Sequence, residues 1–301
     1  MTTIQAGQRP EFGVTAPRHR LPPEARPGLV RLQVADLERS LQFYQDVLGL
    51  ELLEGGPRKL SLGATGGDGA LVELTELPQA RAVPRLGRLG LYHFAIRLSA
   101  REALGSFVVH LQRHGLAAGM SDHDVSEAVY IRDPDGLGIE IYVDRRANEW
   151  PVRGRELHMD TRPLDVADLV ASSGDRSWSG APADSTIGHI HLHVRDLELA
   201  KDFYHGALGF DLTAWSYSGA LFLAVGGYHH HLGVNTWAGP DARRPAPDEA
   251  QLLSWELAVP AAADVDATAR SLEAAGYPVV RDDGGVKVPD PWGTVLELVS
   301  T

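Results

Sequence analysis

An internal repeat constrains the fold of this 301-residue chain more than any other feature of its sequence. The segment VADLERSLQFYQDVLGLEL at residues 34–52 is matched by VRDLELAKDFYHGALGFDL at residues 194–212, with nine of nineteen positions identical. Each copy predicts the end of a strand, an aspartate N-cap, an amphipathic helix and a glycine that ends the helix. Two weaker copies end in DPDGLGIEIYV and DPWGTVLELVS. We therefore expect four units, each a strand, a helix and further strands.

The spacing of the copies divides the chain into two halves. The four units cover roughly residues 28–80, 91–145, 187–240 and 252–301. Residues 1–27 are polar and rich in proline and arginine, which predicts a flexible N-terminal arm. Residues 146–186 carry proline, serine, glycine and charge and are typical of a linker, with one short helix expected near residues 164–171. We predict two domains of two units each, at 28–145 and 187–301.

Composition narrows the classes of function. The absence of cysteine excludes disulfides, thiolate zinc sites, iron–sulfur clusters and thiol catalysis, so histidine, aspartate or glutamate must hold any metal. The chain has thirteen histidines and a formal net charge of −12, with no basic block. This charge argues against a nucleic acid or an anionic membrane as partner. No apolar run is long enough for a membrane span or a signal peptide, and we expect a cytoplasmic protein.

The repeat and its ending motifs carry a family resemblance. The V-x-D-L…FY…LG signature and the DPDG-x-x-I-E ending resemble the vicinal oxygen chelate superfamily, which includes glyoxalase I, fosfomycin-resistance enzymes, bleomycin-binding proteins and extradiol dioxygenases. GLYHFAIRL, SEAVYIRDPDGLGIEIYVDR, GHIHLHVRDL and GGYHHHLGVNTWAG are similar to segments of bacterial two-domain catechol-2,3-dioxygenase-like proteins. The resemblance implies an α+β fold in which four βαβββ modules form two glyoxalase/extradiol dioxygenase-like domains with half-open mixed sheets.

The same resemblance places metal ligands on the first and last strands of paired units. Aligning the four units puts five metal-ligating residues at these positions: Glu73, His93, Glu140, His189 and Glu297. Pairing units two and three combines His93, Glu140 and His189, a set that leaves adjacent coordination positions open, as non-haem Fe(II) oxygenases require. Sequential pairing or pairing of units one and four gives no such complete set. We therefore predict Fe(II), with Mn(II) as the alternative, at these three residues, and not at Glu73 or Glu297.

Further residues of the site follow from the resemblance and from strand alternation. His231 lies two residues before Gly233, on the same strand face, where extradiol dioxygenases have an acid–base histidine, and His230 is then expected to point away. Tyr130, ten residues before Glu140, and His123, seven residues before Tyr130, are predicted to contact the substrate or an intermediate. Two residues are predicted to line the substrate pocket: Trp237 and His191.

Together these features predict an Fe(II)-dependent extradiol dioxygenase that inserts both atoms of O₂ into a catechol-type ring. The expected partners are a small aromatic diol and O₂, and a homo-oligomer is the usual assembly. One alternative is an oxygen-independent, glyoxalase-like lyase or isomerase that recruits Glu73 through sequential pairing. Another is a metal-free protein that sequesters small molecules, as bleomycin-binding proteins do.

Overall fold

The computed structural model describes residues 12–282 and 285–301. Unit one consists of β1 (Arg26–Val34), α1 (Leu37–Asp46), β2 (Glu51–Gly55), β3 (Lys59–Gly63) and β4 (Ala70–Glu76). Unit two consists of β5 (Gly90–Leu98), α2 (Arg101–Arg113), β6 (Gly119–Asp122), β7 (Ser126–Arg132) and β8 (Gly138–Asp144). Unit three consists of β12 (Thr186–His193), α4 (Leu197–Lys201), a π-helical turn η2 (Asp202–Leu208), β13 (Asp211–Ala214), β14 (Ala220–Ala224) and β15 (Leu232–Asn235). Unit four consists of β16 (Gln251–Val259), α5 (Ala262–Ala274), β17 (Val280–Asp282), β18 (Gly285–Pro289) and β19 (Val295–Ser300).

The local signals of the repeat determine where its helices begin and end. The side chain of Asp36 accepts a hydrogen bond from the backbone of Arg39, and Asp196 does the same for Leu199, each at 2.9 Å. These bonds satisfy backbone donors that the first turn of a helix leaves free. The unit-three helix differs from the expected regular helix, because it passes into the π-helical turn before Gly209 ends it at a φ of +107°.

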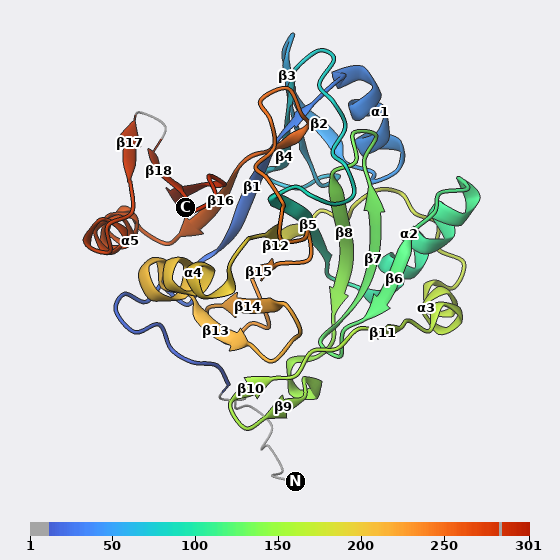
Figure 1. The fold of residues 1–301 in the computed structure, drawn as a ribbon. Coiled ribbons are helices and arrows are strands. Elements are labelled where there is room, and N and C mark those ends of the chain that lie inside the picture. The colour runs from blue at the N-terminus through green and yellow to red at the C-terminus, as the bar shows by residue number, and fades with distance from the viewer. Residues whose placement is uncertain (1–11, 283–284) are drawn as a thin grey trace.

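The four units pair crosswise into two curled mixed sheets (Figure 1). One sheet has the order β17-β18-β19-β16-β1-β4-β3-β2 and joins unit four to unit one. The other has the order β11-β6-β7-β8-β5-β12-β15-β14-β13 and joins unit two to unit three. In Figure 1, blue unit one accordingly lies beside red unit four, and green unit two beside yellow and orange unit three. Each sheet thus draws one unit from each half of the sequence, which is the pairing that the predicted metal site required.

The main core lies between the two sheets. Alternate residues of the central strands point into it: Val30 and Leu32 of β1, Phe94 and Ile96 of β5, Ile190 and Leu192 of β12, and Trp255 and Leu257 of β16. Because successive side chains of a strand face opposite ways, the intervening residues of β5 and β12 point to the concave face of their sheet. This alternation turns His93, His189 and His191 into one cavity.

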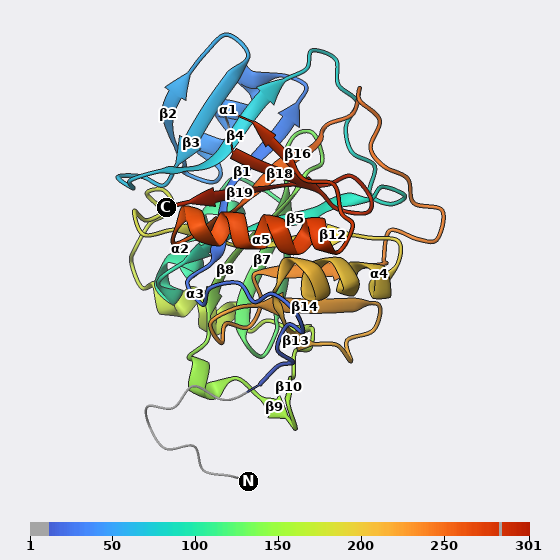
Figure 2. The same cartoon turned by 90° about the vertical axis from the view of Figure 1, so that its left-hand side faces the viewer.

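The segments outside the units also pack on the fold (Figure 2). Within the predicted flexible arm, Val14 pairs with Leu212 of β13, and Leu21 is buried. The expectation of a free arm is therefore wrong for residues 12–25, because their apolar side chains cover unit three, while residues 1–11 lie outside the described part. The linker forms η1 (Ala147–Glu149), β9 (Val152–Arg153), β10 (Glu156–Leu157), β11 (Arg162–Pro163) and the expected short helix, α3 (Val166–Ser173). Among the described helices, none has the length and apolar character needed to cross a membrane.

Candidate metal centre

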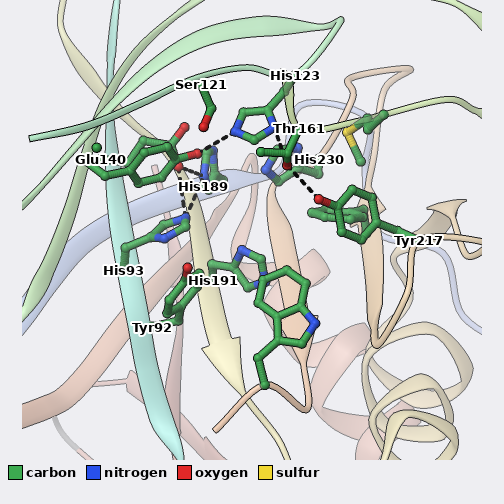
Figure 3. A pocket seen from close by; sticks show the side chains of 15 residues that line it. Tyr92, His93, Ser121, His123, Glu140, Thr161, His189, His191, Tyr217 and His230 are labelled. Carbon is green, nitrogen blue, oxygen red and sulfur yellow. Dashed lines mark hydrogen bonds and ion pairs between the residues drawn. The ribbon is translucent and has the colours of Figure 1, made fainter. Parts of the chain in front are cut away.

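Three side chains that could hold a metal ion converge from three neighbouring strands of the unit-two and unit-three sheet (Figure 3), and we call them the metal-ligating group. His93 lies on β5, Glu140 on β8 to one side of it, and His189 on β12 to the other side. Nε2 of His93 and Nε2 of His189 lie 2.9 and 3.0 Å from the same oxygen of Glu140. All three side chains are buried. The three residues predicted from the sequence alignment therefore come together as a candidate metal site.

The geometry and protonation of this set fit a divalent ion. Nε2 of His93 and Nε2 of His189 are 3.3 Å apart. Three ligands about 2.1 Å from one ion and at right angles to one another would be separated by about 3.0 Å. Burial alone would raise the pKa of Glu140, but His189 and His93 beside it hold that pKa well below its usual value. Burial lowers the pKa of His189. A carboxylate with neutral imidazole is the state that metal binding requires.

The candidate site opens into a cavity of about 340 Å³. Four other residues predicted from the sequence line it: His123, Tyr130, His191 and Trp237. His191 is held by Asn235, whose side-chain amide lies 2.9 Å from its Nε2. The Trp237 ring lies 5.5 Å from the His191 ring, centre to centre, and is partly exposed at the cavity edge. The structure thus brings these residues together around the metal-ligating group, and their roles remain predictions.

Tyr130 and His123 form a hydrogen-bonded pair beside Glu140. Nδ1 of His123 lies 2.9 Å from the backbone oxygen of Asp160, which can only accept, so Nδ1 carries the hydrogen. Nε2 of His123 then accepts from the Tyr130 hydroxyl, 2.7 Å away. Burial, with the nearby Glu140, raises the pKa of Tyr130 well above its usual value. Its hydroxyl therefore remains a hydrogen-bond donor at neutral pH.

The prediction for the YHHH segment is wrong about which histidine faces the metal-ligating group. His230 lines the cavity, with its ring centre 4.1 Å from that of His189. His231 instead lines a second cavity of about 480 Å³ and accepts a hydrogen bond from the backbone of Val225 through Nδ1. The alternation assumed from Gly233 does not extend to His231, because β15 begins only at Leu232. Burial lowers the pKa of His231 to about 3.

In the second sheet, the carboxylates of Glu73 and Glu297, which stand at ligand-like positions, are paired with an arginine. Arg31 of β1 lies between them, with Nε 3.4 Å from Glu73 and Nη1 2.9 Å from Glu297. It also binds Glu256 at 2.7 Å, and Lys59 binds Glu73 at 2.8 Å. One guanidinium thus pairs with three carboxylates of this sheet. Arg31 was not among the residues that the unit alignment singled out.

Several residues that line the cavity were missed by the sequence analysis: Tyr92, Gly119, Ser121, Met159, Thr161, Tyr217 and Phe222. Thr161 and Tyr217 share a hydrogen bond of 2.6 Å across the cavity (Figure 3). Met159 and Thr161 come from the linker, and Tyr217 from the loop between β13 and β14. No repeat marks Met159 and Thr161, because the linker has no counterpart elsewhere in the chain.

Comparison with known proteins agrees with this architecture. Residues 26–141 and 186–298 match the family described as the Glyoxalase/Bleomycin resistance protein/Dioxygenase superfamily. Over 269 residues the chain is 44% identical to a protein named catechol-2,3-dioxygenase from Bacillus subtilis (strain 168), covering 88% of this chain and 93% of that protein.

Solved structures show the same fold at low sequence identity. A putative dioxygenase from Bacillus subtilis subsp. subtilis str. 168 superposes with a TM-score of 0.66 at 14% identity, covering 97% of this chain and 86% of that one. Glyoxalase I from Zea mays superposes with a TM-score of 0.53 at 17% identity, covering 92% of each chain. The family match spans most of both halves, and the chain belongs to the Glyoxalase/Bleomycin resistance protein/Dioxygenase superfamily.

Proposed function

We propose that this protein is an extradiol dioxygenase that holds Fe(II) through His93, Glu140 and His189 and cleaves a catechol-type ring with O₂. The observation that carries the proposal is the convergence of two histidines and one carboxylate from β5, β8 and β12 at the base of a cavity. The relative named catechol-2,3-dioxygenase supports the same reaction class.

The donor set suits this chemistry because three protein ligands leave room on an octahedral ion. Bound Fe(II) would supply coordination positions for both hydroxyl oxygens of a catechol and for O₂. Gly233 allows the ring of His191 to pack against its backbone, since a Cβ there would lie 2.9 Å from that ring. No fourth protein carboxylate or imidazole joins the group among the described residues.

Two sets of side chains would act on the substrate. His230 Nε2 accepts a proton from a catechol hydroxyl, since its ring lies beside His189 in the cavity. Tyr130 and His123 orient the substrate from the opposite side of Glu140, through the hydroxyl that their hydrogen bond positions. His231 takes no part in this scheme because it lines the other cavity.

The cavity also restricts the charge of the substrate. Aromatic side chains form much of its wall: Tyr92, Tyr217, Phe222 and Trp237. No lysine or arginine lines it among the described residues, and Glu140 is its one carboxylate there. A carboxylate on the substrate ring would lose its hydration without gaining a cation. A catechol with no charged substituent is therefore the substrate class that we propose.

The glyoxalase-like alternative has less support from the geometry. In its sequential pairing, Glu73 was expected to join His93 and Glu140. Glu73 instead lies in the other sheet, bound to Lys59 and Arg31.

A single experiment distinguishes the two functions. Protein purified under anoxic conditions is analysed for bound metal and then given catechol with and without O₂. We expect about one iron per chain, O₂ uptake, and a ring-opened product that absorbs visible light. Equal turnover without O₂, or an absence of bound metal, would refute the proposal.

A further inference from the structure

We propose that Asp144 and His229 are positioning residues that hold His230 in the tautomer with its hydrogen on Nδ1, so that Nε2 faces the cavity as a proton acceptor. The inference deepens the proposed function, since it assumes that His230 acts on a substrate there. It concerns three side chains outside the metal-ligating group.

These three residues form a continuous hydrogen-bonded chain between the two cavities. Nε2 of His229 lies 2.7 Å from Oδ1 of Asp144, and Nδ1 of His229 lies 2.7 Å from Nδ1 of His230. His229 is completely buried. Asp144 lines the cavity of about 480 Å³ and His230 lines the metal-site cavity, so His229 bridges the space between them.

The donors and acceptors of the chain fix its direction. A carboxylate can only accept, so Nε2 of His229 must carry a hydrogen. In neutral His229, Nδ1 is then the acceptor, and the hydrogen between the two rings belongs to Nδ1 of His230. Nε2 of His230 is left without a hydrogen. The arrangement resembles a hydrolase triad, in which a carboxylate orients an imidazole through a hydrogen bond. Here a second imidazole, that of His229, lies between the carboxylate and the imidazole that it orients.

Other contacts keep Asp144 in its accepting form. The hydroxyl of Tyr228 lies 3.0 and 3.1 Å from its two oxygens, and Nη1 of Arg97 lies 3.6 Å from Oδ2. Burial alone would raise the pKa of Asp144, but the hydrogen bond from His229 and the charge of Arg97 hold it below its usual value. A guanidinium can only donate hydrogen bonds. In Asp144→Asn the side-chain amide oxygen should therefore face Arg97, and the amide nitrogen should face His229. The hydrogen bonds of the chain would then reverse, and Nε2 of His230 would carry the hydrogen.

The tautomer of His230 can be read directly by nitrogen NMR. The full-length protein is labelled with ¹⁵N at histidine and loaded with Zn(II), which has no unpaired electrons to broaden the signals. A ring nitrogen without hydrogen resonates far downfield of one that carries hydrogen. We expect Nε2 of His230 to be the downfield nitrogen in the unmodified protein and Nδ1 to be the downfield nitrogen in Asp144→Asn. In the iron-loaded enzyme, Asp144→Asn should lower kcat by about 100-fold or more with little change in KM.

Tyr228→Phe is the matched control, because it removes a hydrogen bond to Asp144 and leaves the carboxylate and His229 in place. It should retain the tautomer and most of kcat. His229→Phe is a second variant, in which His230 should show both tautomers because Nδ1 has lost its acceptor. An unchanged nitrogen pattern in Asp144→Asn, or an equal loss of kcat in Tyr228→Phe, would overturn the proposal. If the unmodified protein shows the expected tautomer but does not cleave catechols, the proposed function fails and the positioning role of Asp144 and His229 stands.

Discussion

Nε2 of His93 and Nε2 of His189 lie 3.3 Å apart, although the two residues are separated by 96 positions in the sequence. They meet because β5 and β12 are antiparallel neighbours in the sheet that joins units two and three. The register places His191 opposite His93, while His189 on β12 and Glu140 on β8 both lie opposite Ala95 of β5, one on each side of that strand. The candidate metal site therefore depends on contact between the two halves of the chain.

The first prediction concerns metal binding. His189→Ala and Glu140→Gln should each abolish stoichiometric iron binding and ring cleavage, because each removes one of three ligands. Iron content by elemental analysis and O₂ uptake with catechol measure the two effects. Glu73→Gln is the matched control, since Glu73 holds the equivalent position in unit one and binds Lys59 and Arg31 instead. Full iron content in Glu140→Gln would contradict the assignment.

The second prediction concerns the stability of the other sheet. Arg31→Met should lower the free energy of unfolding by about 2 kcal/mol, because Glu256 and Glu297 would remain partly buried without the Arg31 cation. Adding Glu297→Gln should recover part of the loss. Arg281→Met removes an ion pair with Glu273 that is exposed on both sides, and should cost far less because solvent screens such a pair. Denaturant titration measures the free energy of unfolding of the three variants. Equal losses of this free energy in Arg31→Met and Arg281→Met would contradict the prediction.

The third prediction concerns pH and His231. Burial lowers the pKa of His231 from its ordinary value near 6.5 to about 3. Between these values the unfolded chain binds a proton that the folded chain does not, so the free energy of unfolding falls as the pH falls from about 6.5 toward 3. Above about pH 7 this contribution is absent. In His231→Gln, which does not titrate, the fall between pH 7 and pH 4.5 should be shallower, as urea titrations at several pH values can measure. If the free energy of unfolding depends on pH equally in the unmodified protein and in His231→Gln, the prediction is wrong.

The fourth prediction concerns substrate charge. Catechol should be turned over with a kcat/KM at least about tenfold above that of 3,4-dihydroxybenzoate, because the cavity offers no cation to the carboxylate. Thr161→Arg adds a cation at an exposed residue of the cavity rim. This variant should lower the ratio of kcat/KM for catechol to kcat/KM for 3,4-dihydroxybenzoate. Tyr217→Phe removes the same hydrogen bond to Thr161 without adding charge and should leave the ratio unchanged. A preference for the carboxylated substrate in the unmodified protein would contradict the proposed class.

The fifth prediction concerns the hydroxyl of Tyr130. Tyr130→Phe should retain iron but lower kcat by about 10- to 100-fold, because the substrate loses the acceptor oxygen that the hydrogen bond to His123 positions. Metal analysis and steady-state kinetics test the two parts separately. Loss of iron in this variant would show that Tyr130 supports the metal ligands instead of the substrate.

The sequence was most informative where a feature repeats. The aspartate caps, the helix stripes and the DPDG-type endings recur, so the four units and their helices could be located from the order of residues alone. The alignment of the units, read with the family resemblance, also predicted the ligand positions, and β5, β8 and β12 bring these three residues together. The prediction failed at His231, where the strand had not yet begun, since alternation determines direction only inside a regular strand.

The sequence by itself determined the local units, the absence of thiol ligands and the residue types available to a metal. Only the tertiary structure decided that units two and three share a sheet, that Arg31 fills the corresponding space between units one and four, and that His229 connects Asp144 to His230. The physical reason is that helix caps and strand alternation are interactions between residues close in sequence. Strand order and buried charge pairing depend on which distant surfaces can bury their apolar faces together and still satisfy every polar group.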